Sequence, residues 1–162
     1  MDIYYTIIDA PPGPVYAAES KTGLFFVHLG PDSYNNLVAF AQKYYPEAQV
    51  VPSVIDAAPQ IMEYVAGERR DFDLPLDLKG TDFQLQVWRA LQGIPYGRTE
   101  TYAQVAESVG RSGGAQAVGQ ANKANPIPIV IPCHRVVEKD GNLGGFAPGP
   151  EWKKWLLDLE KA

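Results

Sequence analysis

The residues that bind metals or form disulfides are almost missing from this sequence. Among its 162 residues there are one cysteine, Cys133, and two histidines, His28 and His134. A single cysteine cannot form an internal disulfide, and so few candidate ligands argue against a structural zinc site. We therefore expect no bound metal. A chain without disulfides also suits the reducing cytoplasm.

Long uncharged stretches are missing as well. No stretch free of Asp, Glu, Lys and Arg exceeds 11 residues, whereas a membrane-spanning helix needs about 20 apolar residues. The first residues, Met1 to Tyr5, contain no basic cluster of the kind that opens a secretory signal. These features predict a cytoplasmic protein without a membrane partner. With 46% hydrophobic residues, the chain has enough apolar side chains for a packed core.

The sequence has no excess of basic residues. Its formal net charge is −5, which argues weakly against a nucleic-acid partner. The charge is unevenly divided, because residues 1–80 contain 11 acidic and 5 basic side chains, whereas residues 81–162 contain 8 and 9. This asymmetry suggests two regions with different partners. On charge alone, an acidic solvated surface is the simpler interpretation.

The first half of the chain mixes strand and helix patterns. The predicted elements are a strand over 3–8, a hairpin of 15–18 with 24–28, and helices over 32–44, capped by Asp32, and from Ser53 or Asp56 to Gly67. A polar joint follows, in which apolar residues at 72, 74, 76 and 78 alternate with polar residues or proline. That period of two indicates an extended segment with one face docked. We place a domain boundary near Lys79.

The second half is predicted to be mostly helical. Thr81 and Gln84 form a capping box at the start of a helix that ends near Ile94. A short helix over 101–109, a glycine-containing turn and a helix over 114–124 follow, which is the layout of a helix-turn-helix. An ordinary pair of packed helices has the same layout. The small residues of 114–124 suit either tight packing within the protein or close approach to a nucleic-acid groove.

The most reactive residue type follows a stiff, apolar segment. Residues 125–132 contain three prolines and predict an extended edge strand or a rigid loop that leads to Cys133 and His134. Adjacent residues of an extended chain point to opposite faces, so a cooperating Cys–His pair needs a turn here or a bridging water. The predicted C-terminal helix offers Glu151, Asp158 and Glu160 to orient the histidine. The alternative is a buried, inert cysteine beside a satisfied histidine.

Motifs across residues 80–160 resemble the O6-alkylguanine-DNA alkyltransferase family. The matching residues are Pro132-Cys133-His134-Arg135-Val136-Val137, Ile94-Pro95-Tyr96-Gly97, Thr99 with Thr101, Tyr102 and Ala106, Ala117-Val118-Gly119, Asn125-Pro126 and Gly144-Gly145. The first half resembles the family's variable N-terminal domain only in length and in the order of its elements. The resemblance implies an α+β protein. Residues 1–79 would form a mixed α/β domain with a small antiparallel sheet. Residues 80–162 would form a mostly helical domain with a winged-helix-like helix-turn-helix and the active-site cysteine.

The resemblance also implies a function and a set of residue roles. Family members flip O6-alkylguanine out of duplex DNA and move its alkyl group irreversibly to cysteine, once per molecule and without a cofactor. Here Cys133 would be the nucleophile, His134 a base acting through water, Glu160 its orienting partner, Asn125 a brace and Tyr102 a donor to guanine N3. The substrate pocket would be formed by Val136, Gly144, Gly145, Phe146, Ala147 and Pro148. The sequence-independent contacts to the DNA minor groove would come from Thr101, Arg111, Gly114, Ala115, Gln116, Ala117, Gly119, Gln120, Lys123 and Arg135.

Three positions depart from the family pattern. Gln116 stands where the family usually has an arginine finger that fills the gap left by the flipped base. Phe146 replaces a frequent tyrosine, and Pro148 a frequent glycine or bulky residue. The resemblance implies a monomer in the cytoplasm, associated with the nucleoid, or in the nucleus of a eukaryote. The alternatives are an alkyltransferase-like damage-recognition protein with weak duplex activity because of Gln116, a Cys–His hydrolase, and a structural domain.

Overall fold

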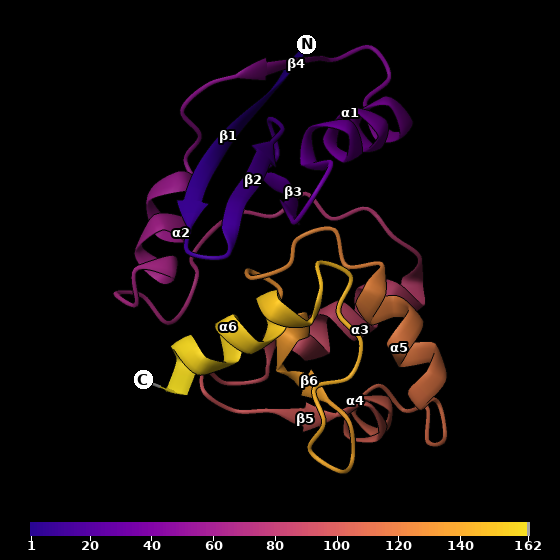
Figure 1. Ribbon diagram of the computed structural model, residues 1–162. Helices are drawn as coiled ribbons and strands as arrows, with labels where there is room; N and C mark the ends of the chain where they lie inside the picture. Colours follow the sequence, from indigo (N-terminus) through magenta and orange to yellow (C-terminus); the bar gives the residue numbers. More distant parts are fainter. Residues whose placement is uncertain (162) are drawn as a thin grey trace. The chain divides into compact units, whose positions relative to one another are not determined.

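The chain forms two compact units, whose helices and strands are drawn in Figure 1. The computed structural model describes residues 1–161, and the first unit ends at Lys79. Side chains such as Ile3, Phe25 and Leu37 are buried in the first unit, and Trp88 and Leu91 in the second. No helix within residues 1–161 is both long and apolar enough to cross a membrane.

A four-stranded sheet is the centre of the first unit. Its strands are β1 (Asp2–Ala10), β2 (Gly13–Glu19), β3 (Leu24–Leu29) and β4 (Gln49–Pro52), in the spatial order β3-β2-β1-β4. The predicted hairpin is confirmed, because β2 and β3 pair antiparallel around residues 20–23. The small sheet is antiparallel, as expected, except at one edge, where β4 pairs parallel with β1. The helix between β3 and β4 lets the chain return in the parallel direction.

Two helices complete the first unit. The helix α1 (Ser33–Tyr44) packs on β2 and β3, and α2 (Ala58–Val65) contacts β1. Asp32 precedes α1 as predicted, but its side chain makes no capping bond because its backbone is left-handed at φ 58°. The start predicted for α2 at Ser53 or Asp56 is too early, since the helix begins after Ala57 with a proline in its first turn.

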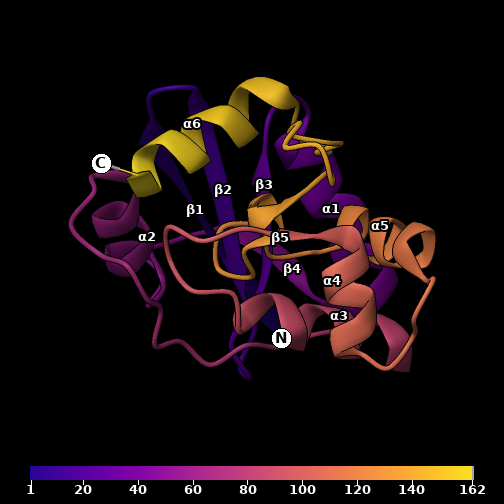
Figure 2. The ribbon, with the colours of Figure 1, turned by 90° about the horizontal axis from the view of Figure 1, so that it is seen from below.

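The second unit is mostly helical, as predicted. Its helices are α3 (Asp82–Gln92), α4 (Tyr102–Ser108), α5 (Ala115–Lys123) and α6 (Pro150–Lys161). The capping box of Thr81 and Gln84 is present at the start of α3. A second capping box, of Thr101 and Gln104, starts α4. Figure 2 shows α4 and α5 beside each other, and their contact confirms the predicted helix–turn–helix layout.

A small strand ladder connects the helices to the cysteine segment. The strands β5 (Glu100–Thr101) and β6 (Val136–Val137) pair parallel, so that Glu100 lies opposite Val136. Between α5 and β6, residues 125–132 form an irregular loop rather than an edge strand, and Cys133–Arg135 form one turn of 3-10 helix. The ladder therefore brings the start of α4 next to the end of the cysteine turn.

Candidate active site

Cys133 lies at the start of the 3-10 turn and is 4% exposed. The turn breaks the alternation of an extended chain, so adjacent side chains need not point to opposite faces. The sequence required such a turn, or a bridging water, for Cys133 and His134 to cooperate, and the structure has the turn.

The loop before Cys133 is held rigidly by Asn125. Its Nδ2 donates to the carbonyl of Ile131 at 2.9 Å, and its Oδ1 accepts from the N–H of Ile127 at 2.9 Å. Between the two residues that Asn125 binds, Ile129 has a φ of 76°. This backbone conformation is strained for a β-branched residue and persists only when the surrounding structure imposes it. The predicted brace thus has two hydrogen bonds that fix both ends of the loop.

Glu160 on α6 joins His134 and Arg135. Its Oε2 lies 2.8 Å from His134 Nε2, and the Arg135 guanidinium donates to both carboxylate oxygens at 2.9 Å. Arg135 also donates to the carbonyl of Ile94 at 2.7 Å and is only 6% exposed. The prediction that Arg135 contacts DNA is therefore wrong, because its guanidinium is buried and bonded within the protein. Glu151 and Asp158, the other candidate carboxylates, are exposed.

The resting protonation states follow from burial. Burial raises the pKa of the Cys133 thiol to about 11, against the opposing effects of Asn125 and Lys153. Burial also lowers the pKa of His134, although Glu160 favours its charged form. At neutral pH the site therefore holds a thiol and a neutral imidazole. With Nε2–H directed at Glu160, Nδ1 carries the lone pair that can accept a proton.

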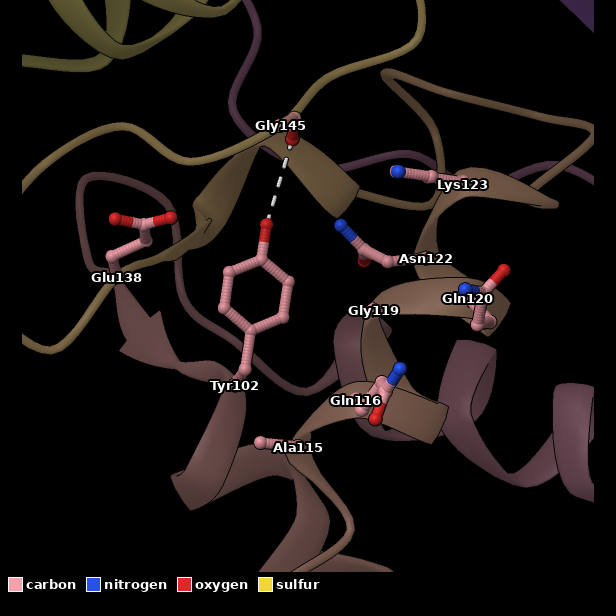
Figure 3. Close-up of a pocket in the computed structure, with 9 residues that line it drawn as sticks. All are labelled: Tyr102, Ala115, Gln116, Gly119, Gln120, Asn122, Lys123, Glu138 and Gly145. Atoms are coloured by element: carbon pink, nitrogen blue, oxygen red, sulfur yellow. Dashed lines mark hydrogen bonds between the residues drawn. The ribbon is translucent and has the colours of Figure 1, made fainter.

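Tyr102 is the first residue of α4, directly after the ladder strand β5. Its hydroxyl donates to the carbonyl of Gly145 at 3.5 Å, a weak contact drawn in Figure 3. Gly144 has a φ of 76°, and a Cβ there would lie 3.0 Å from the Tyr102 hydroxyl oxygen. Burial, with Glu138 and Cys133 adding to it, raises the pKa of Tyr102, so the phenol is protonated and able to donate.

A pocket of about 370 Å³ opens between Tyr102 and α5. It is lined by Tyr102, Ala115, Gln116, Gly119, Gln120, Asn122, Lys123, Glu138 and Gly145. Figure 3 shows Tyr102 on one side of this hollow and the α5 residues on the other. Five of the predicted DNA-contacting residues thus share one pocket with Tyr102 and Gly145.

The other predicted contacts lie outside this lining. For DNA they are Thr101, Arg111, Gly114 and Ala117, and for the substrate Val136, Gly144, Phe146, Ala147 and Pro148. The Thr101 hydroxyl caps α4, and the Arg111 guanidinium stacks on the Phe83 ring at 4.4 Å from its centroid. A Cβ on Gly114 would lie 2.8 Å from the Arg111 carbonyl oxygen, so the close turn before α5 requires glycine there.

Two polar residues near the site were not predicted. Lys153 on α6 is fully buried, and its Nζ donates to the carbonyls of Val136 at 2.6 Å and Gly145 at 3.4 Å. Asn122, also buried, donates to the carbonyl of Cys133 at 3.3 Å. A signal for Lys153 was present, because it lies between Trp152 and Leu156 on the apolar face of the C-terminal helix.

Within residues 1–161, no three His, Cys, Asp or Glu side chains gather closely enough to hold a metal ion. The chemistry that the described residues offer is that of a buried thiol, a neutral imidazole held by a carboxylate, and a phenol donor beside a pocket. A thiol of this kind becomes a nucleophile when a base takes its proton.

Both units match models of one protein family. Residues 82–162 match the DNA-binding domain of 6-O-methylguanine DNA methyltransferase, and residues 3–78 match its ribonuclease-like domain. The Bacillus subtilis constitutive methylated-DNA–protein-cysteine methyltransferase is 41% identical over 159 residues, which cover 98% of this chain and 95% of the relative. A methylated-DNA–protein-cysteine methyltransferase of Methanosarcina acetivorans is 39% identical over 166 residues, covering 98% of each chain.

Solved structures with the same fold include a protein bound to DNA. The crystal structure of Mycobacterium tuberculosis OGT in complex with DNA matches with a TM-score of 0.85 and 40% identity, covering 98% of this chain and 92% of that one. The O6-methylguanine-DNA methyltransferase of Pyrococcus kodakaraensis matches with a TM-score of 0.77 and 25% identity over 99% of both chains. The likeness therefore extends through both units.

Proposed function

The chain belongs to the 6-O-methylguanine DNA methyltransferase family, and we propose that it repairs DNA by transferring the alkyl group of O6-alkylguanine irreversibly to Cys133. The observation that carries this proposal is the buried Cys133 on a turn beside His134, which Glu160 holds at 2.8 Å. Curated relatives about 40% identical over nearly the whole chain are named methylated-DNA–protein-cysteine methyltransferases.

The transfer is a single displacement. The thiolate of Cys133 attacks the alkyl carbon, an S–C bond forms, and the C–O6 bond breaks with its electron pair passing to guanine. The thiol proton passes through a water to Nδ1 of His134, and the carboxylate of Glu160 stabilises the resulting imidazolium. The protonated Tyr102 donates to N3 of guanine and so neutralises the leaving base. The thioether is stable, so each molecule reacts once.

DNA binding is assigned to α5 and the pocket beside it. The minor groove of B-DNA is about 6 Å wide, so only a slim helix enters it. Ala115, Ala117 and Gly119 keep α5 slim, and Gln116 and Lys123 are exposed on it. Contacts from such residues to phosphates position the protein without reading sequence, which suits a protein that must search all DNA. Base flipping costs a few kcal/mol, and least for a damaged pair.

Gln116 favours a second candidate, a protein that recognises alkylated guanine but transfers its group slowly from duplex DNA. The neutral amide of Gln116 can fill the space that a flipped base leaves in the duplex. Unlike an arginine, it has no positive charge to attract a phosphate or to bind the cytosine that has lost its partner. The presence of Cys133 favours transfer over mere recognition. We place either activity in the compartment that holds the DNA, the cytoplasm with its nucleoid in a bacterium, and assign it to a monomer.

The test is the intact mass of the protein after mixing with a duplex that carries one O6-methylguanine. We expect a stoichiometric gain of one methyl group, located on Cys133 by peptide mapping. The control is Cys133→Ala, which should bind the same duplex in a gel shift and gain no mass. If the unaltered protein binds without gaining mass, the damage-recognition candidate replaces the transferase.

A further inference from the structure

Asn122 contains a buried hydrogen-bond acceptor that the described residues do not use. The residue lies on α5 and is 5% exposed. Its Nδ2 donates to the carbonyl of Cys133 at 3.3 Å, so the nitrogen of the amide faces the cysteine turn. Its Oδ1 is buried, and no donor among residues 1–161 lies within hydrogen-bond distance of it. Buried polar atoms of native proteins are nearly always paired, so an unpaired one indicates a partner that binds later.

The unpaired oxygen belongs to a residue that lines the pocket beside Tyr102. Figure 3 shows the Asn122 side chain directed from α5 toward Tyr102. The other two side-chain amides of the lining, those of Gln116 and Gln120, are exposed, so solvent can satisfy them. The amide of Asn122 is buried and therefore depends on a ligand that brings a hydrogen-bond donor into the pocket.

The base that we assign to this pocket has one group that can donate. Alkylation of O6 leaves N1 of guanine without a proton, and N9 is bonded to the deoxyribose. The only N–H groups of the base are then those of the exocyclic 2-amino group. This group is attached to C2, the ring carbon next to N3, and Tyr102 donates to N3 in the proposed transfer. A base that is held at N3 by Tyr102 therefore brings its donor into the pocket that Asn122 also lines.

We propose that Oδ1 of Asn122 accepts a hydrogen bond from the 2-amino group of the flipped guanine, which makes Asn122 a specificity-determining residue. This inference rests on the proposed alkyl transfer. One amide then binds the base through Oδ1 and the carbonyl of the attacking Cys133 through Nδ2. A base without the 2-amino group leaves Oδ1 unpaired, and a site built around a buried polar group rejects such analogues.

The test compares two DNA duplexes whose lesions differ only in this amine. One carries O6-methylguanine, and the other carries O6-methylhypoxanthine, which has hydrogen in place of the 2-amino group. The measurement is the second-order rate constant of methyl transfer. We expect the unaltered protein to react about tenfold faster with O6-methylguanine, as one buried hydrogen bond gained or lost implies.

The decisive variant is Asn122→Leu, because leucine has nearly the size of asparagine and no polar atom. The preference for O6-methylguanine should fall by about tenfold, mainly through slower reaction of that duplex, whereas the rate with O6-methylhypoxanthine should stay within about threefold. The carbonyl of Cys133 keeps a partner in this variant, since it also accepts from the N–H of Val136. Differences in stability between the two duplexes cancel when the ratios of two proteins are compared.

The matched control is Asn36→Leu, the same substitution on α1 of the first unit. Asn36 is exposed, and its Nδ2 donates to the carbonyl of Asp32. Both rate constants should be unchanged. If Asn122→Leu fails to fold, as judged by circular dichroism, Asn122→Ala is measured in the same way and its ratio decides.

An unchanged ratio in the Asn122 variant would overturn the proposal, because equal slowing of both duplexes shows only that Asn122 supports the cysteine turn. Recognition is also measured without transfer, by a competition gel shift of the two duplexes with Cys133→Ala. Its preference for O6-methylguanine should disappear when Asn122→Leu is added, and a preference that persists would contradict the role of Asn122. Absence of methyl transfer by the unaltered protein, with this binding preference present, would contradict the proposed function alone.

Discussion

Single residues in the second unit acquire their chemistry from burial and from one or two specific partners. A thiol and an imidazole would titrate near pH 8.5 and 6.5 when exposed, but burial raises the pKa of Cys133 and lowers that of His134. Both groups are therefore neutral before reaction. A hydrogen bond to Glu160 orients His134. The same carboxylate accepts hydrogen bonds from the guanidinium of Arg135, a residue that the sequence had assigned to DNA contact.

Gln116 allows a test of the DNA-binding side of the site. Gln116→Arg adds a positive charge at the mouth of the pocket, and a hydrogen bond to a charged group contributes about 1.5–3 kcal/mol. We expect methyl transfer from duplex DNA to become about tenfold faster. The slope of log affinity against log salt concentration should steepen by about one unit.

The control for Gln116→Arg is a free-base probe of the benzylguanine type, which needs no duplex and no flipping. Its reaction rate should be the same in both proteins. Equal duplex rates for Gln116→Arg and the unaltered protein would show that position 116 does not act in flipping here.

Helix caps and the short strand ladder set the geometry at the scale of elements. Two helices of the second unit start with capping boxes, at Thr81 and Thr101. The second of these matters for the site, because Tyr102 is the first residue of the helix that Thr101 caps. The β5–β6 pair then holds this helix start beside the strand that follows the cysteine turn.

Thr101→Ala is expected to lower the free energy of unfolding by about 1 kcal/mol, the usual contribution of a helix N-cap. It should also slow methyl transfer, since a frayed first turn of α4 leaves Tyr102 less well placed. Chemical denaturation and the rate of methyl transfer are the two measurements.

Thr81→Ala is the matched control for the cap of α4, because Thr81 caps a helix that does not carry Tyr102. We expect a similar loss of stability and an unchanged rate. Thr101→Ser should restore the cap and the rate. An unchanged rate of methyl transfer in Thr101→Ala would show that the N-cap of α4 does not affect the reaction.

At the scale of the whole molecule, the two units share one response to acid. Each contains one histidine, and burial lowers the pKa of both His28 and His134. The unfolded chain takes up these protons near pH 6.5, whereas the folded chain takes them up only at lower pH. The contribution to stability is therefore complete above about pH 6.5 and declines as the pH falls below it.

Tryptophan fluorescence can follow this response in the second unit, because the three tryptophans, at 88, 152 and 155, all lie there. We expect the guanidinium chloride concentration at the midpoint of unfolding to be lower at pH 5.5 than at pH 7.5. His134→Gln should remove most of the change, whereas His28→Asn should leave it in place. A midpoint that is equal at both pH values would contradict the assignment of a neutral, buried His134.

Short-range sequence signals predicted most of the elements but not how distant segments meet. The capping box at Thr81, the hairpin of β2 and β3 and the pair α4–α5 depend on residues within a few positions of one another, so they could be read directly. Asp32 marked the start of α1 correctly, although its left-handed backbone keeps its side chain from capping.

The features that were missed depend on long-range contacts. The parallel pairing of β4 with β1, the burial of Arg135 against Glu160 and the placement of Lys153 beside Val136 each join segments far apart along the chain. The motifs spread over residues 80–160, the Pro-Cys-His-Arg run among them, were enough to predict the family, and the comparisons confirm it. The protonation state of Cys133 could not be predicted from the sequence, because its pKa depends on burial. The thiol is buried only once the loop, the turn and α6 have packed together.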